Sequence, residues 1–182
     1  MKINFLLTVV LFLVFQSAGA QVYYTKNGNV TFFSKSPLQD IEAENNQVIS
    51  VMNIQTGELQ FSLLNNAFHF PKAKMEEDFN ENYMESNKYP RSGFKGMVTD
   101  INAVDFTKDG TYPVAVKGDL TIHGVTKTIT AKGAIIVSKG TISAVSSFTV
   151  FVKDYGIKIP NIVSNNIAER IKISVNCSYQ EK

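Results

Sequence analysis

Residues 114–130 constrain the fold more than any other part of this chain. Apolar and polar side chains alternate along this segment as far as Ile122, with a period of two residues. That period is typical of a strand with one buried face and one solvated face. His123 and Gly124 interrupt the alternation, and β-branched residues resume directly at Val125. The segment therefore predicts a tight β-hairpin that turns at His123-Gly124.

Comparable signals recur along the rest of the chain. Runs rich in Val, Ile, Thr and Phe are separated by short turn signals, which predicts an antiparallel meander closed into a barrel or folded as a sandwich. The turn signals are Asn27-Gly28, Ser36-Pro37, Thr56-Gly57, Asp109-Gly110, His123-Gly124, Lys139-Gly140 and Asp154-Tyr155-Gly156. The predicted strands are 22–26, 30–35, 47–54, 58–64, 92–107, 112–122, 125–138, 141–153 and 167–179. These segments can supply an eight-stranded sheet.

One segment, residues 72–85, departs from the β pattern. Met75, Phe79 and Tyr83 follow one another at spacings of four, and acidic side chains fill much of the remainder. This pattern predicts an amphipathic helix that packs its apolar stripe on one barrel mouth and exposes its acidic face. No histidine, cysteine or glycine-rich oxygen loop accompanies the acidic residues, so we expect neither a metal site nor a catalytic role for them.

The N-terminus has the features of a secretory signal peptide. Lys2 precedes an apolar stretch at residues 5–15, and the small residues at 17–20 predict cleavage after Ala20. The apolar stretch is shorter than the roughly 20 residues of a membrane-spanning helix, so we expect the mature chain to be soluble, without a transmembrane anchor. Residues 21–182 suffice for one domain, and no repeat or linker marks a second.

The charge and the cysteine content exclude several classes of protein. The formal net charge is +2 and the basic residues are scattered, so nothing favours binding to nucleic acid or to an anionic surface. Cys177 is the only cysteine, which excludes a disulfide framework within the chain. It shares strand parity with apolar residues from Ile171 to Tyr179, so we expect a buried and inert thiol.

No pattern for catalysis or for a cofactor emerges. The chain has no Gly-x-Ser-x-Gly, Ser-x-x-Lys, Walker or dinucleotide-binding motif. Neither His69 nor His123 has a second histidine at metal-site spacing. His69 could edge a cavity mouth, although a structural role is favoured, and we expect His123 to bond local backbone. An enzyme that uses either histidine as a base remains a minor hypothesis.

The length of the strands bears on function. At about 3.3 Å per residue, runs of ten or more residues span more than 30 Å, and a closed eight-stranded sheet can hold one slender ligand. A barrel filled by its own side chains is an equally good hypothesis at this point. The residues expected to face inward are Val114, Val116, Leu120, Ile122, Val125, Ile129, Ala131, Phe148, Val150, Val152, Ile171, Ile173 and Val175.

Three motifs resemble those of the YceI-like family of exported proteins. Leu-Thr-Ile-His-Gly-Val-Thr-Lys at 120–127 resembles the most specific one, and Tyr-Gly-Ile at 155–157 and Tyr-Pro at 89–90 followed by Phe94 resemble two others. The resemblance covers most of the mature chain. It implies an eight-stranded antiparallel lipocalin-like β-barrel with a helical element that binds polyisoprenoid or related amphiphilic lipids in the periplasm.

The chain departs from the common pattern of that family in the predicted helix. Many members carry Arg-Asp-x-His-Leu there, whereas this chain reads Met-Glu-Glu-Asp-Phe-Asn-Glu-Asn-Tyr-Met at 75–84. Aromatic and methionine side chains could instead form a flexible apolar mouth. The candidate ligand-binding residues are Phe68, Phe70, Met75, Phe79, Tyr83, Phe94, Val116, Leu120, Ile122, Phe148, Val150, Ile171, Ile173 and Val175.

Two functional hypotheses of different classes follow. The first is a periplasmic carrier, without catalytic activity or cofactor, that encloses an isoprenoid, quinone-like or fatty-acyl chain. The second is an exported stress-response or interaction module with a filled barrel, which contacts a protein partner through Tyr83, Tyr89 or a strand edge.

Overall fold

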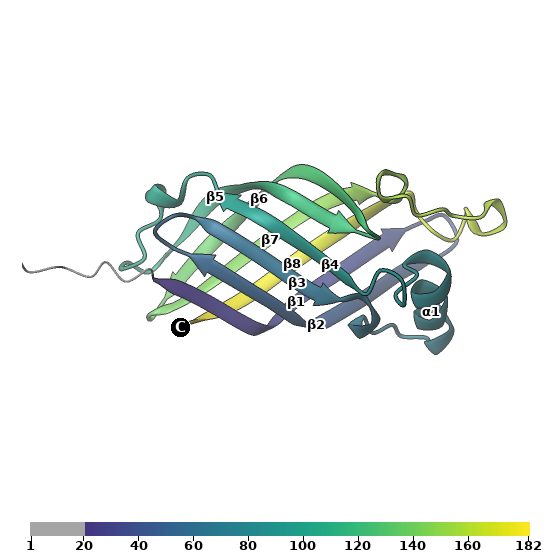
Figure 1. The fold of residues 1–182 in the computed structure, drawn as a ribbon, viewed down its shortest axis with the longest axis horizontal. Coiled ribbons are helices and arrows are strands. Elements are labelled where there is room, and N and C mark those ends of the chain that lie inside the picture. The colour runs from purple at the N-terminus through teal and green to yellow at the C-terminus, as the bar shows by residue number, and fades with distance from the viewer. Residues whose placement is uncertain (1–20) are drawn as a thin grey trace, which may run out of the picture.

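The structure is a computed structural model and describes residues 21–182; the predicted signal peptide lies outside the described residues. Eight antiparallel strands form a closed barrel in which each strand pairs with its neighbours in the chain and β8 pairs with β1 (Figure 1). The eight-stranded antiparallel barrel is therefore confirmed. The strands are β1 (Val22–Lys35), β2 (Asp40–Asn53), β3 (Glu58–Leu64), β4 (Arg91–Val98), β5 (Gly110–Ile122), β6 (Val125–Ser138), β7 (Thr141–Phe151) and β8 (Arg170–Glu181).

The turn predicted at Asn27-Gly28 is wrong, because β1 continues through it as a β-bulge. Thr25 pairs with Ser50 and Gly28 pairs with Val48, so β1 carries one extra residue at this point. Between this pair and the next one, Val30 with Asn45, β2 carries one extra residue, which restores the register. Such bulges bend a strand without ending it. One long strand therefore replaces the two short ones that the sequence predicted.

Other strand limits also differ from the prediction. The strand predicted at 92–107 ends at Val98, and a short 3-10 helix, η3 (Ile101–Ala103), follows. The strand predicted from 47 begins at Asp40 instead, because its first half alternates small and polar side chains that give a weak apolar signal. The limits of β3 and β6 agree with the prediction.

The connections divide the barrel into two ends (Figure 1). Three connections lie at one end, here called the helix end, together with the β5–β6 turn: residues 36–39, 65–90 and 152–169. The opposite end carries the turns at 54–57 and 139–140, the connection at 99–109 and the C-terminus. Within the described residues, no helix is long and apolar enough to cross a membrane.

The predicted amphipathic helix is present at the helix end, but only its first half is α-helical. α1 (Ala73–Asp78) continues directly into a π-helical turn, η2 (Phe79–Tyr83). The backbone N–H of Met84 donates to the carbonyl oxygen of Phe79 at 2.8 Å, which is the i to i+5 bond of a π-turn. The wider turn keeps Met75, Phe79 and Tyr83 on the side that faces the barrel interior.

Side chains fill the barrel near its opposite end. Met52 and Cys177 are completely buried there, and Ile135, Ile142 and Tyr179 pack with them in one hydrophobic cluster. The prediction of a buried thiol is confirmed, and burial raises the pKa of Cys177 to about 12. The packed cluster closes this end, so access to the interior is from the helix end.

Candidate functional site

A cavity of about 370 Å³ occupies the barrel toward the helix end. Its lining comes from all eight strands, from the helical segment and from the β7–β8 connection, and it is mostly apolar. The volume lies near the lower limit of ordinary ligand pockets, which suits one slender molecule. Met52, Val98 and Ile135 form its floor beside the packed cluster.

The burial of the inward-facing side chains also shows that this part of the barrel is hollow. Ile122, Phe148 and Ile173 point into the barrel, yet each is only half-buried. Inward-facing residues of a filled core would be excluded from water, because protein interiors are close-packed. Side chains therefore fill the barrel only near the opposite end, and the hypothesis of an entirely filled barrel is wrong.

Every residue that the sequence singled out as ligand-binding lines this cavity. Their role in binding stays a prediction, but their convergence is a feature of the structure. Strand parity predicted those from β5, β7 and β8, the family motif pointed to Phe94, and the apolar spacing predicted those of the helix. The residues are Phe68, Phe70, Met75, Phe79, Tyr83, Phe94, Val116, Leu120, Ile122, Phe148, Val150, Ile171, Ile173 and Val175.

Of the further residues expected to face inward, Val125 does not line the cavity and packs instead against the core. Several lining residues were not predicted. Phe32 of β1 and Phe61 of β3 have inward parity in their strands, and that parity could have revealed them. The lining residues of the β7–β8 connection, such as Ile159 and Ile167, carry no periodic signal.

Four phenylalanine rings form a cluster at the helix end. Phe32 of β1 lies 5.4 Å from Phe68, 5.6 Å from Phe70 and 5.5 Å from Phe79, measured between ring centroids. Phe79 also lies 5.5 Å from Phe68 and 5.1 Å from Phe70. These separations fall in the range of favourable aromatic pairs. The cluster therefore fixes the helical segment to β1 over the cavity.

Two glycines make room for an aromatic ring on the opposite wall. Gly96 of β4 and Gly118 of β5 are cross-strand partners. A Cβ atom added at Gly96 or Gly118 would lie 2.7 or 2.8 Å from Cζ of Phe94, respectively. The Phe94 ring therefore lies over the two glycines and forms part of the cavity wall.

His123 joins three segments that are distant in the sequence. Its Nδ1 lies 3.1 Å from the carbonyl oxygen of Tyr155, and its Nε2 lies 2.9 Å from Oε2 of Glu85. The Tyr89 ring packs edge-on at 4.4 Å, and a Cβ atom at Gly124 would come within 2.6 Å of that ring. The prediction of a bond to local backbone is wrong, since both partners are more than 30 residues away.

His69 does not edge the cavity, which corrects that expectation. Its side chain is 64% exposed and lies 3.8 Å from a carboxylate oxygen of Glu76. Its backbone forms an antiparallel bridge with Glu44 of β2. Neither histidine lines the cavity. In residues 21–182, no three His, Cys, Asp or Glu side chains gather where they could hold a metal ion.

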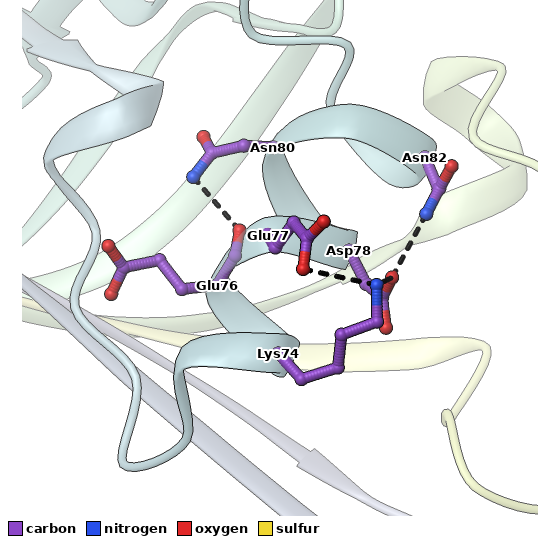
Figure 2. Close-up of polar contacts among 6 residues, drawn as sticks. All are labelled: Lys74, Glu76, Glu77, Asp78, Asn80 and Asn82. Carbon is purple, nitrogen blue, oxygen red and sulfur yellow. Dashed lines mark hydrogen bonds and ion pairs between the residues drawn. The ribbon is translucent and has the colours of Figure 1, made fainter.

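The acidic face of the helix is held together mainly by local contacts (Figure 2). Lys74 Nζ lies 3.2 Å from Oε2 of Glu77 and 3.0 Å from Oδ1 of Asp78, and Asn82 donates to Asp78 at 3.1 Å. These side chains are largely exposed, so their ion pairs contribute little to stability. Asp78 also reaches the cavity rim, where burial and then this carboxylate raise the pKa of Tyr83.

Three polar side chains at the rim have unused hydrogen-bonding capacity. Gln39, Tyr83 and Asn166 line the cavity at the helix end and come from three different connections. Within the described part of the chain, their side chains make no hydrogen bond to another residue. The deeper polar residues differ, because Asn65 and Ser92 bond to each other at 2.8 Å. Polar groups that are free to bond a ligand are therefore concentrated at the mouth.

A family model described as the YceI-like domain matches residues 16–179. Among solved structures, a polyisoprenoid binding domain from Saccharophagus degradans is 13% identical, with a TM-score of 0.77 over 90% of this chain and 99% of that one. Burkholderia cenocepacia BcnA is 14% identical, with a TM-score of 0.66 over 84% of this chain and 96% of that one. A mutant YceI protein of Campylobacter jejuni is 12% identical, with a TM-score of 0.56 over 100% of this chain and 93% of that one. No curated protein sequence matches the chain.

Proposed function

This chain belongs to the YceI-like domain family, and on that premise we propose that it binds a lipid and encloses one long apolar chain in its barrel. The hollow, apolar cavity at the helix end is the observation that carries the proposal. The similarity to a polyisoprenoid binding domain supports a polyisoprenoid as ligand, with quinone-like and fatty-acyl chains as chemically related alternatives.

The lining can supply the necessary affinity without a charged anchor. Burial of ten methylene groups contributes roughly 0.8 kcal/mol each, or about 8 kcal/mol before the costs of association and ordering. The apolar floor of Met52, Val98 and Ile135 offers nothing to a polar group. The apolar end of the ligand therefore enters first, and its polar end stays at the mouth.

Gln39, Tyr83 and Asn166 are the residues we assign to the polar end of the ligand. Two amides and one hydroxyl can both donate and accept hydrogen bonds, which suits an uncharged oxygenated head group. The Tyr83 hydroxyl is protonated at neutral pH and can donate, and burial raises its pKa further. Because Asp78 lies at the same rim, a phosphorylated head group would meet a negative charge there.

The proposal includes no catalytic step. The histidines lie outside the cavity, and the Cys177 thiol, whose pKa is raised to about 12, is buried and protonated at neutral pH. We also propose export to the periplasm, supported by the signal-peptide features of residues 1–20 and by the family. The function is then to carry or sequester a lipid that water does not dissolve.

An uptake assay with paired variants tests the proposal. The purified protein is incubated with a polyprenol, a quinone and a fatty acid, separated from excess ligand, and assayed for bound lipid. Ile173→Glu introduces a charge into the cavity, whereas Lys172→Glu places the same side chain on the outer face of the same strand. We expect Ile173→Glu to abolish uptake and Lys172→Glu to retain it. Equal uptake by two folded variants would contradict the proposed lining.

A further inference from the structure

The helix end carries the two most exposed large aliphatic side chains of the described residues. Leu38, in the β1–β2 connection, is 72% exposed, and Ile162, in the short helix η5 (Asn161–Val163) of the β7–β8 connection, is 92% exposed. The two connections touch, since the Leu38 backbone N–H donates to the carbonyl oxygen of Asn165 at 3.3 Å. Both therefore belong to one rim, on the side where the β7–β8 connection projects (Figure 1).

This rim continues directly into the cavity. Gln39 and Ile41 follow Leu38 into the lining, while Ile159 and Val163 flank Ile162 and also line the cavity. Neither Leu38 nor Ile162 lines the cavity itself. The two exposed tips thus lie next to apolar residues that lead into the lipid-sized interior.

We propose that Leu38 and Ile162 insert into the surface of a lipid bilayer and place the cavity mouth against it, so that the ligand passes between bilayer and barrel. This inference rests on the proposed lipid-binding function. A long apolar chain crosses water only at a large cost in free energy, because its whole apolar surface becomes hydrated. A mouth seated on the bilayer removes that aqueous step.

The charges of the rim are compatible with insertion by apolar contact rather than by electrostatic attraction. The two connections and their flanking residues carry four basic and three acidic side chains: Lys35, Lys153, Lys158, Arg170, Asp40, Asp154 and Glu169. Their formal charges nearly cancel, with one basic side chain in excess, so the rim is not a polybasic patch of the kind that selects anionic lipids. We therefore expect binding to uncharged and anionic bilayers alike.

Vesicle cosedimentation tests the inference with a matched control. The full exported chain is mixed with vesicles of phosphatidylcholine, and separately with vesicles that also contain phosphatidylglycerol. The test variant is Leu38→Ser with Ile162→Ser. The control is Ile49→Ser with Met97→Ser, which removes two aliphatic side chains of about 46% and 47% exposure from the outer barrel wall.

We expect the wild-type protein and the control to bind both vesicles, and the test variant to bind at least roughly tenfold more weakly. Equal binding by the test variant, or no binding by the wild-type protein, would overturn the inference. A dimer that is lost in the test variant, with no vesicle binding by any form, would also overturn it and assign the rim to a second copy of the chain.

Lipid uptake from detergent separates this inference from the proposed function. The test variant keeps the whole cavity lining, so we expect it to take up the same amount of lipid as the wild-type protein when the ligand is delivered in micelles. Normal uptake with lost vesicle binding supports the inference. Absence of uptake by the wild-type protein would contradict the function itself, and the inference with it.

Discussion

The imidazole of His123 contacts the carboxylate of Glu85 at 2.9 Å and thereby ties the end of the helical segment to the β5–β6 turn. The other ring nitrogen contacts the carbonyl oxygen of Tyr155, which can only accept a hydrogen bond. The Glu85 carboxylate is likewise an acceptor, so each ring nitrogen of His123 faces an acceptor oxygen. Glu85 itself has a positive φ of 43°, a conformation that needs such support.

His123→Ala should therefore destabilise the fold. The His123 side chain is only 11% exposed, and its removal leaves the Tyr155 carbonyl without this partner. We expect a loss of about 1–3 kcal/mol in the free energy of unfolding, measured by urea denaturation. His69→Ala is the control and should cost less than about 0.5 kcal/mol, because that side chain is exposed. Equal effects of the two substitutions would contradict the structural role of His123.

Cys177 should make stability depend on alkaline pH. Burial raises its pKa from 9.0 to about 12, so the folded state favours the neutral thiol. The contribution of the neutral thiol to the free energy of unfolding is complete below pH 9. It is lost as the pH rises toward 12, because the thiol of the unfolded chain releases its proton first. The wild-type protein should lose up to about 1.4 kcal/mol per pH unit in this window relative to Cys177→Ala. Parallel pH profiles of the two proteins would show that the thiol is not buried as described.

Gly118→Ala should disrupt the cavity wall. A Cβ atom at this position would collide with the backbone of Gly96 and Lys95 and with the Phe94 ring. Backbone atoms cannot move as a flexible side chain does, so we expect a cost of about 1–3 kcal/mol or more in thermal or urea unfolding. Gly110→Ala is a suitable control, since its Cβ would meet only the Tyr112 ring at 3.3 Å. A Gly118→Ala protein as stable as Gly110→Ala would argue against the close approach of β4 and β5.

Phe79→Ala should loosen the helical segment over the cavity. Phe79 packs against three other rings, and its loss removes those contacts from the mouth. We expect faster release of bound lipid, measured by stopped-flow dilution. We also expect a loss of about 1–3 kcal/mol in the free energy of unfolding, measured by urea denaturation. Lys74→Ala, which removes only exposed ion pairs on the same helix, should leave release unchanged. Unchanged release from Phe79→Ala would exclude the aromatic cluster as a barrier.

The sequence predicted the barrel and much of its lining because strand parity is a local property. Ile171, Ile173 and Val175 face inward for the same reason that their polar neighbours face outward. The bulge at Asn27-Gly28 carries the signature of a turn, so the sequence predicted two short strands in place of β1. A local pattern identifies an asparagine-glycine pair, but it does not tell whether the pair ends a strand or lies within one.

Other features depend on contacts that no local pattern encodes. The partners of His123 lie 32 and 38 residues away, so only the closed barrel brings them together. The hollow interior is likewise a balance between barrel circumference and side-chain volume. Met52 and Cys177 fill one end, whereas the half-buried Phe148 and Ile173 leave space at the other.

Organic-solvent extraction and mass spectrometry of the purified exported protein would show whether this barrel holds one lipid. We expect a stoichiometric polyisoprenoid, quinone-like or acyl species that is absent from Ile173→Glu and present in Lys172→Glu. An extract without lipid, from a folded protein that also fails to take up added polyprenols, quinones and fatty acids, would contradict the proposed function.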